Sequence, residues 1–136
     1  LRGVVSQRLL PRANGGRVAA VEVMVSNSRI QELIRENKPE YVAEAIAEGA
    51  FFQMQTLTKA LIELVLAGEV DEEVAAGAAP NRHDFTIALA FAQKEDAVRR
   101  QREAEAAQAV AEAAAAGAIA EQEQIGLKLV DGLRVV

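Results

Sequence analysis

The sequence contains no cysteine and no tryptophan, and its aromatic residues are one tyrosine and four phenylalanines. Without cysteine the chain can form no disulfide framework, thiol nucleophile or cysteine metal site, which fits the cytoplasm. So few aromatic rings disfavour nucleic-acid binding by base stacking. The formal net charge of -5 also disfavours a general affinity for nucleic acid or for an anionic membrane surface. We therefore expect no nucleic-acid partner.

Long apolar runs and nucleotide-binding motifs are missing as well. No apolar run is long enough to cross a bilayer and no signal-peptide pattern opens the chain, so we expect no direct membrane insertion. Neither GxxxxGK[ST] nor GxGxxG occurs. The single histidine, His83, has Asp84 beside it but no further ligands, which indicates a loop residue. We expect no catalytic residue, no cofactor-binding residue and no metal ligand in this chain.

The N-terminal segment predicts a β-hairpin over about residues 8–25. Asn14 and Gly15 form a tight-turn signal because both residues tolerate a positive φ. The run "RVAAVEVMV" that follows is rich in β-branched residues, so we expect a largely buried second strand. Glu22 is the only charge inside this run and should pair with a nearby arginine, because an unpaired buried carboxylate is costly.

From residue 28 the apolar period becomes that of helices, over about residues 28–92. In "SRIQELIRE", Ser28 and Gln31 have the spacing of a capping box, and Asn37 and Pro39 end the first helix. Three apolar residues of this helix share one side and are expected in the core: Ile30, Leu33 and Ile34.

Further start and stop signals predict more helices. A second helix begins near Pro39 and ends by Gly49. A third runs from Thr56 to Gly68, and a fourth, with acidic residues in its first turn, ends before Pro80. "DFTIALAFA" begins a fifth. The inward residues expected on the second helix are Tyr41, Val42, Ala45 and Ile46.

Residues 94–136 differ in composition and are expected to form an alanine-rich helical tail, separate from a domain at residues 1–93. Helix formers dominate, and Glu95 with Arg99 and Asp96 with Arg100 have the spacing of i, i+4 ion pairs. Large apolar side chains are nearly missing, which favours a solvated helix or a fraying, flexible tail over a coiled-coil strand. The final stretch "IGLKLVDGLRVV" could add a strand or lie on the surface.

Four segments in order resemble the C-terminal end of the pilus retraction ATPases of the type II/IV secretion ATPase superfamily. They are "LRGVVSQRLLPR", "GGRVAAVEVMV", "SRIQELIRE" and "FFQMQTLTKAL", within residues 1–89. The resemblance implies an α+β, mostly α-helical fold, in which a β-hairpin from the end of a RecA-like ATPase core precedes a helical C-terminal bundle.

The same resemblance implies a function in twitching motility. Members of this family form cytoplasmic hexameric rings that bind ATP and Mg²⁺ and disassemble the pilus together with pilus machinery at the inner membrane. Their Walker A and Walker B segments would lie before Leu1, and the chain opens inside the apolar run "LRGVV", so we expect a C-terminal fragment without ATPase activity of its own.

"RIQELIRE" corresponds to the family's retraction signature, "AIRNLIRE". The positions that match are Ile30, Leu33, Ile34, Arg35 and Glu36, and the positions that depart are Arg29, Gln31 and Glu32. Two alternatives stay open: a fragment of a type II secretion or pilus assembly ATPase, and a non-catalytic helical adaptor that binds a motor.

Overall fold

The computed structural model describes the backbone of residues 1–132 and the side-chain burial of residues 1–115 and 117. It divides into two compact units, Leu1–Lys94 and Glu95–Val136, which are described separately below. The fold is α+β and mostly helical, which confirms the predicted class. In chain order the elements are β1 (Gly3–Pro11), β2 (Arg17–Val25), α1 (Ser28–Arg35), the 3₁₀ helix η1 (Pro39–Tyr41), α2 (Val42–Ala47), the 3₁₀ helix η2 (Gly49–Phe52), α3 (Leu57–Leu66), α4 (Glu72–Ala78) and α5 (Arg82–Gly132).

Strands β1 and β2 form the predicted antiparallel hairpin, in a register from Gly3 opposite Val25 to Pro11 opposite Arg17. The first strand begins earlier than the expected residue 8, because Val4 and Val5 extend the pairing along the apolar second strand. Gly15 and Gly16 carry the positive φ angles of the turn, at 90° and 81°, whereas Asn14 does not. Glycine suits this turn because it has no Cβ to clash.

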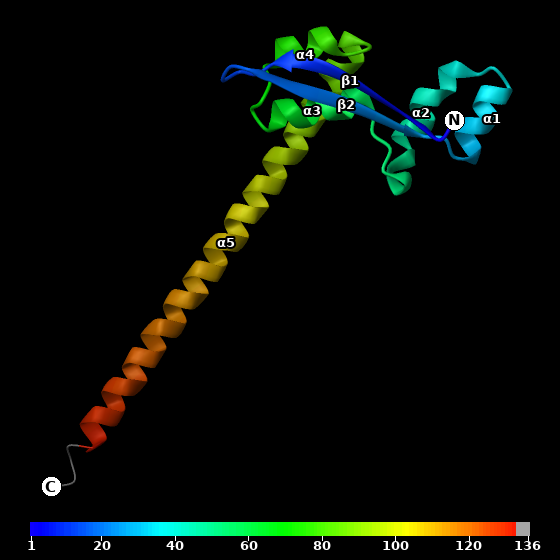
Figure 1. Ribbon diagram of the computed structural model, residues 1–136. Helices are drawn as coiled ribbons and strands as arrows, with labels where there is room; N and C mark the ends of the chain where they lie inside the picture. Colours follow the sequence, from blue (N-terminus) through cyan, green and yellow to red (C-terminus); the bar gives the residue numbers. More distant parts are fainter. Residues whose placement is uncertain (133–136) are drawn as a thin grey trace. The chain divides into compact units, whose positions relative to one another are not determined.

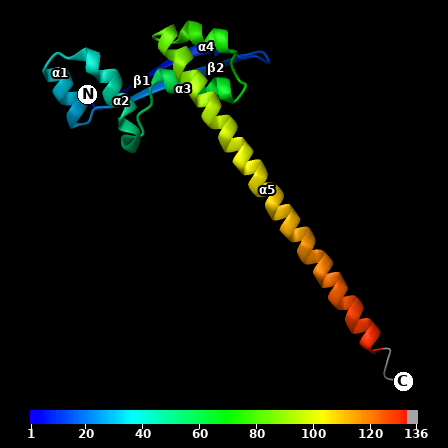
Figure 2. The ribbon, with the colours of Figure 1, turned by 180° about the vertical axis from the view of Figure 1, so that it is seen from behind.

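Helices α3 and α4 cover one face of the hairpin. The strands lie in front of these helices in Figure 1 and behind them in Figure 2. Arg8 of β1 donates a hydrogen bond to the carbonyl oxygen of Ala78 at the end of α4. The prediction of a largely buried second strand is wrong, since Ala20 is its only fully buried residue and the opposite face of the hairpin lacks a covering layer in the described part of unit 1.

The hairpin, α3, α4 and the first turns of α5 enclose the larger of two hydrophobic clusters. Thr56 caps α3 by accepting a hydrogen bond from the Lys59 amide at 3.2 Å, and Gly68 follows its end with a φ of 71°. Both predicted ends of this helix are confirmed. The buried members of the larger cluster are Leu10, Ala20, Leu57, Ala60, Leu61, Val70, Ala75, Ala76, Phe85 and Leu89.

The smaller cluster lies beneath α1 and α2, and two residues predicted to join it do not. Ile34 is 52% exposed and Tyr41 is 47% exposed. Helix α1 has only eight residues and packs along the side that carries Ile30 and Leu33, so a residue at the edge of that apolar stripe stays in contact with solvent. The buried members of the smaller cluster are Ile30, Leu33, Ala45, Ile46 and Met54.

A short connection ties the smaller cluster to the hairpin. Met54 belongs to the cluster, and the next residue, Gln55, forms an isolated bridge with Val23 of β2. The Val23 amide donates to the Gln55 carbonyl oxygen at 2.8 Å, and the Gln55 amide donates back at 3.0 Å. The side-chain amide of Gln55 also donates to the carbonyl oxygen of Val21 at 2.9 Å. Gln55 therefore occupies part of the outer edge of β2.

Helix α5 continues without interruption from Arg82 to Gly132. His83 lies in its first turn, so the interpretation of His83 as a loop residue is wrong. A strand over residues 125–132 is wrong as well, while residues 133–136 lie outside the described residues. No glycine or proline occurs between Asp84 and residue 116, so the change of composition near residue 94 carries no helix stop.

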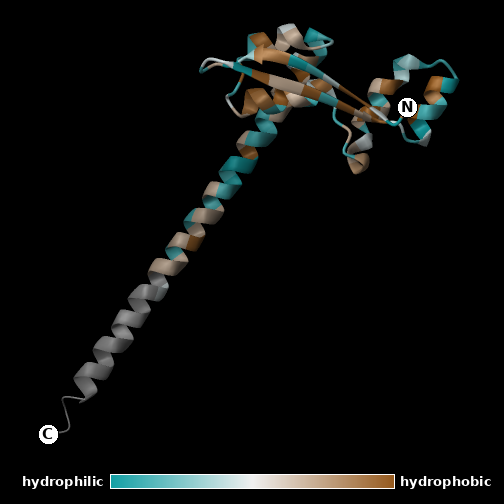
Figure 3. Ribbon diagram, viewed as in Figure 1, coloured by the Kyte–Doolittle hydropathy of each residue, from teal (hydrophilic) through white to brown (hydrophobic). Residues whose placement is uncertain are grey.

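In the second unit the side chains described from residue 97 to residue 115 are all exposed. Figure 3 shows mainly pale and polar colours along this part of α5. Asp96 pairs with Arg100 at 2.6 Å, as predicted, but it also pairs with Arg99, which the sequence had assigned to Glu95. Polar pairs three and four residues apart support a helix of this kind where packing does not.

Candidate functional site

Helix α1 is held in place by its apolar side. Ile30 is fully buried and Leu33 is 2% exposed, so the opposite side of the helix turns toward solvent. The helix starts one residue earlier than predicted: Asn27, and not Ser28, is the N-cap, and its side chain accepts a hydrogen bond from the Ile30 amide at 2.9 Å. Two buried residues and one cap thus orient the whole predicted retraction signature.

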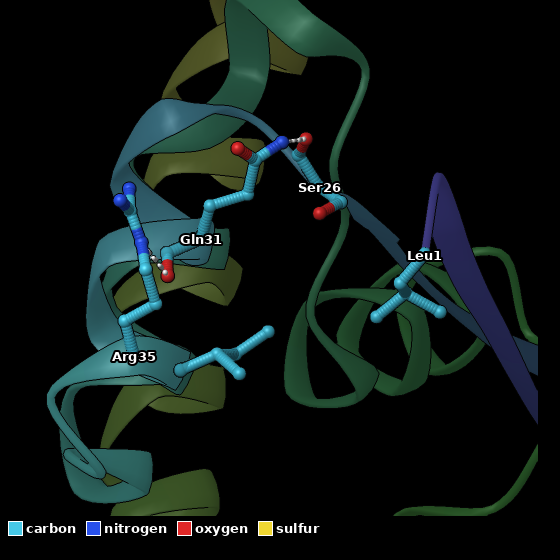
Figure 4. A pocket seen from close by; sticks show the side chains of 5 residues that line it. Leu1, Ser26, Gln31 and Arg35 are labelled. Atoms are coloured by element: carbon cyan, nitrogen blue, oxygen red, sulfur yellow. Dashed lines mark hydrogen bonds between the residues drawn. The ribbon is translucent and has the colours of Figure 1, made fainter.

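The outward residues of α1 are fixed by hydrogen bonds to nearby backbone. The side-chain amide of Gln31 donates to the carbonyl oxygen of Ser26 at 3.0 Å. The Nε of Arg35 donates to the carbonyl oxygen of Gln31 at 3.3 Å, and Figure 4 shows both bonds. The terminal nitrogens of Arg35 make no hydrogen bond within the described residues. The guanidinium is therefore fixed through its Nε, while its two terminal nitrogens are available to a partner.

The C-terminus of α1 ends in a Schellman motif, with Asn37 in the left-handed region at a φ of 53°. The Lys38 amide donates to the Leu33 carbonyl oxygen at 2.9 Å, and the Asn37 amide donates to that of Ile34 at 3.2 Å. This turn brings the Lys38 ammonium to 2.8 Å from Glu36. The hydrogen bond and charge of Lys38 lower the pKa of Glu36, and Glu36 raises the pKa of Lys38 in return.

An open pocket of about 370 Å³ lies against this side of α1. Figure 4 shows Arg35 and Gln31 on α1, with Leu1 across from them on the chain that enters β1. The lining combines apolar surface with an amide and a guanidinium, and it offers no general base to activate Ser26. Such a surface suits contact with another protein segment better than acid–base chemistry. Its lining residues are Leu1, Ser26, Gln31, Ile34 and Arg35.

Of the five predicted signature residues, the structure places two inside and three outside. Ile30 and Leu33 belong to the smaller cluster, whereas Ile34, Arg35 and Glu36 are exposed. The prediction that Ile34 belongs to the core is wrong. The three exposed residues follow one another in the last turn of α1 and at its C-cap, where each contacts solvent, and they are called the outer edge of α1 below.

Phe51 and Phe52 are exposed aromatic residues that the sequence analysis treated only as part of a link. Phe51 is 91% exposed, and its ring meets that of Phe52 edge to face, with centroids 5.3 Å apart. Two adjacent phenylalanines just before a helix cap, outside any amphipathic period, were the signal that could have identified them.

Glu22 is stabilised differently from the predicted arginine pairing, which is wrong. Its Oε1 accepts a hydrogen bond from the Leu57 amide at 3.3 Å, in the first turn of α3, and its Oε2 accepts from Ser6 Oγ at 3.5 Å. A carboxylate at a helix N-terminus complements the helix dipole. Among the described residues no group of three or more His, Cys, Asp or Glu side chains is arranged to hold a metal ion. In that same part of the chain, no helix is both long and apolar enough to cross a bilayer.

Comparison with known proteins finds similarity to pilus retraction proteins, although no protein-family model matches. The type IV pilus retraction ATPase PilT of Pseudomonas aeruginosa is 42% identical over 73 residues, which cover 54% of this chain and 21% of PilT. The twitching motility protein of Neisseria gonorrhoeae is 38% identical over 88 residues, which cover 64% of this chain and 24% of that protein. The chain thus spans about a fifth to a quarter of the length of these relatives.

The fold agrees with this similarity. A crystal structure of the pilus retraction motor PilT with bound ADP is 40% identical in the superposed part and has a TM-score of 0.51, over 62% of this chain and 23% of that chain. Sequence and fold therefore point to the same protein, and the predicted resemblance of this chain to the C-terminal part of the pilus retraction ATPase PilT is confirmed.

Proposed function

We propose that this chain acts as the C-terminal part of a pilus retraction ATPase, and that α1 couples ATP hydrolysis to disassembly of the pilus. The observation that carries the proposal is the division of α1. Ile30 and Leu33 are fully buried, while the outer edge of Ile34, Arg35 and Glu36 is exposed. Burial of the first two residues accounts for folding, and the exposed three are available for contact with another part of a motor.

In this proposal the motor is a cytoplasmic hexameric ring, and ATP and Mg²⁺ bind to segments outside this chain. The pilus machinery at the inner membrane is the partner. The names of the two curated relatives, a pilus retraction ATPase and a twitching motility protein, support retraction over the alternatives of secretion and pilus assembly.

The connection through Gln55 gives the coupling a physical route. Met54 packs in the cluster beneath α1, and Gln55 is hydrogen-bonded to Val21 and Val23 of β2. Because packed clusters and paired strands move as units, a displacement of the hairpin is passed to α1 through this connection. The hairpin is the part of the chain that the proposal assigns to the ATPase core.

A chimera tests the proposal. Residues 1–89 of this chain replace the matching segment of the Pseudomonas aeruginosa PilT, and the product is expressed in a strain that lacks its own PilT. We expect ring assembly, ATP hydrolysis and restored twitching. A chimera that assembles and hydrolyses ATP but restores no twitching would contradict the retraction assignment.

The same experiment separates the alternatives. A segment from a pilus assembly ATPase should yield a motor that hydrolyses ATP but does not shorten pili. A segment from a non-catalytic adaptor should fail to complete the ATPase core, so neither ring nor hydrolysis would be found.

A further inference from the structure

A series of three hydrogen bonds joins the outer side of α1 to the start of the hairpin. The Nε of Arg35 donates to the backbone carbonyl oxygen of Gln31 at 3.3 Å. The side-chain amide of Gln31 donates to the carbonyl oxygen of Ser26 at 3.0 Å, as Figure 4 shows. The Ser26 amide donates to the carbonyl oxygen of Arg2 at 2.9 Å, one step beyond the paired residues of β1 and β2. The bond made by the Gln31 side chain is thus the one that crosses from the helix to the hairpin.

Gln31 is not needed to hold α1 on the fold. Burial of Ile30 and Leu33 holds the apolar side of this eight-residue helix, and the Asn27 side chain caps its first turn. The Gln31 side chain is exposed, and water can replace its bond to Ser26, so the bond adds little to the stability of the chain. It does attach α1 at a point outside the apolar contact, and such an attachment restrains rotation of the helix about its own axis.

We propose that Gln31 is a positioning residue, which through its bond to Ser26 sets the direction in which the outer edge of α1 faces relative to the hairpin. The inference rests on the proposed function, in which this edge contacts another part of the motor and the hairpin belongs to the ATPase core. It adds a second route from the hairpin to α1, on the exposed side of the helix, beside the buried route through Met54 and Gln55.

The required chemistry at position 31 is a hydrogen-bond donor. Gln31 stands where the signature "AIRNLIRE" has its first arginine, and a guanidinium is also a donor, on a longer side chain. The proposal therefore predicts that either side chain serves at this position, although one is neutral and the other is charged. The two other departures from the signature, Arg29 and Glu32, pair with each other at 3.6 Å and take no part in the three bonds.

Three variants of the chimeric motor test the proposal. Gln31→Met removes the donor but keeps an unbranched, uncharged side chain. Its ring should assemble and hydrolyse ATP, while the ratio of retraction speed to hydrolysis rate should fall by up to about tenfold, the change in population that loss of one hydrogen bond produces. Gln31→Arg keeps a donor and should keep the ratio. Glu32→Met is the matched control, an exposed neighbour on α1 outside the three bonds, and should keep the ratio too.

The 136-residue chain gives a second readout that needs no motor. Nitrogen relaxation of the Arg35 Nε–H group should show an ordered side chain in the wild type, in Gln31→Arg and in Glu32→Met, and a more mobile one in Gln31→Met. Equal melting temperatures would show that all three variants fold.

The outcomes separate this proposal from the proposed function. A wild-type chimera without twitching counts against the retraction assignment, and the order of Arg35 then still decides whether Gln31 positions the edge. Equal mobility of Arg35 in the wild type and in Gln31→Met would overturn the positioning role. So would a Gln31→Met motor with the wild-type ratio of retraction to hydrolysis, or a Gln31→Arg motor as impaired as Gln31→Met.

Discussion

The two hydrophobic clusters of the first unit differ in size and in what they support. The larger cluster joins the hairpin, α3, α4 and the start of α5, and its largest buried side chain is Phe85. The smaller cluster has five buried members and supports α1 and α2, with Met54 as its link toward the hairpin. The outer edge of Ile34, Arg35 and Glu36 thus belongs to a helix that packs on the smaller cluster. Local stability follows the amount of packed apolar surface, so α1 should open more easily than α3.

The larger cluster should respond most strongly to truncation. Phe85→Ala removes a fully buried ring and leaves a cavity between α3, α4 and the hairpin, so we expect a loss of roughly 3–5 kcal/mol in the free energy of unfolding. Urea titration followed by circular dichroism measures it. A loss below about 1 kcal/mol would mean that this cluster is not the principal core.

Truncation in the smaller cluster should cost less and should act locally. For Leu33→Ala we expect the lower part of the range of about 2–5 kcal/mol, because a small cluster collapses more easily around a cavity. Native-state hydrogen exchange should show faster opening of the α1 amides, with those of α3 unchanged. Equal acceleration in both helices would show that the two clusters unfold as one.

The N-caps of α1 and α3 allow a matched comparison in which the expected loss in the free energy of unfolding is smaller. Asn27→Ala and Thr56→Ala each remove one side-chain acceptor from a helix N-terminus, and each should cost about 1 kcal/mol. Asn27→Ser keeps an acceptor and serves as the control. We expect Asn27→Ala to speed hydrogen exchange in α1 alone, while Thr56→Ala should speed exchange in all the elements that pack on the larger cluster. The reverse pattern would refute the conclusion that the two clusters differ in local stability.

The smallest effect is expected at the exposed pair of Glu36 and Lys38. Lys38→Met removes the hydrogen bond and the charge that lower the pKa of Glu36, so this pKa should rise toward its ordinary value. In the wild type the contribution of the ionised Glu36 to folding stability is complete above the ordinary carboxyl pKa. This contribution is lost as the pH falls through the lowered pKa. NMR titration of the Glu36 side chain measures the shift. An unchanged pKa would mean that the pair does not persist in solution.

Elements with explicit start and stop residues could be predicted from the sequence. Thr56 and Gly68 delimit α3 because a hydroxyl satisfies a free amide and glycine accepts a positive φ. The hairpin followed from the turn signal of Asn14 and Gly15 and from the β-branched run that comes after it. The boundary of α1 did not follow to the residue, because Asn27 and Ser28 are both good caps and the sequence alone does not choose between them.

Features that depend on packing could not be predicted. The exposure of Ile34 depends on how far α2 covers α1, and the partner of Glu22 is an amide 35 positions along the chain that only the folded arrangement brings near. The fifth helix and the helical tail were both expected, but their continuity in α5 was missed, because the change of composition near residue 94 was treated as a boundary between two segments. For the candidate site, the sequence identified the residues, and the structure identified which of them face outward.

The central claim is that the exposed edge at the end of α1 serves retraction and not folding. Arg35→Glu in the chimeric motor tests it most directly, with Arg29→Glu as the control on the same helix at a position that departs from the signature. Both are surface changes and should alter stability by less than about 1 kcal/mol. We predict that both variants assemble and hydrolyse ATP, and that twitching is lost with Arg35→Glu but kept with Arg29→Glu. Normal twitching with Arg35→Glu would contradict the claim and show that this edge is an ordinary solvated surface.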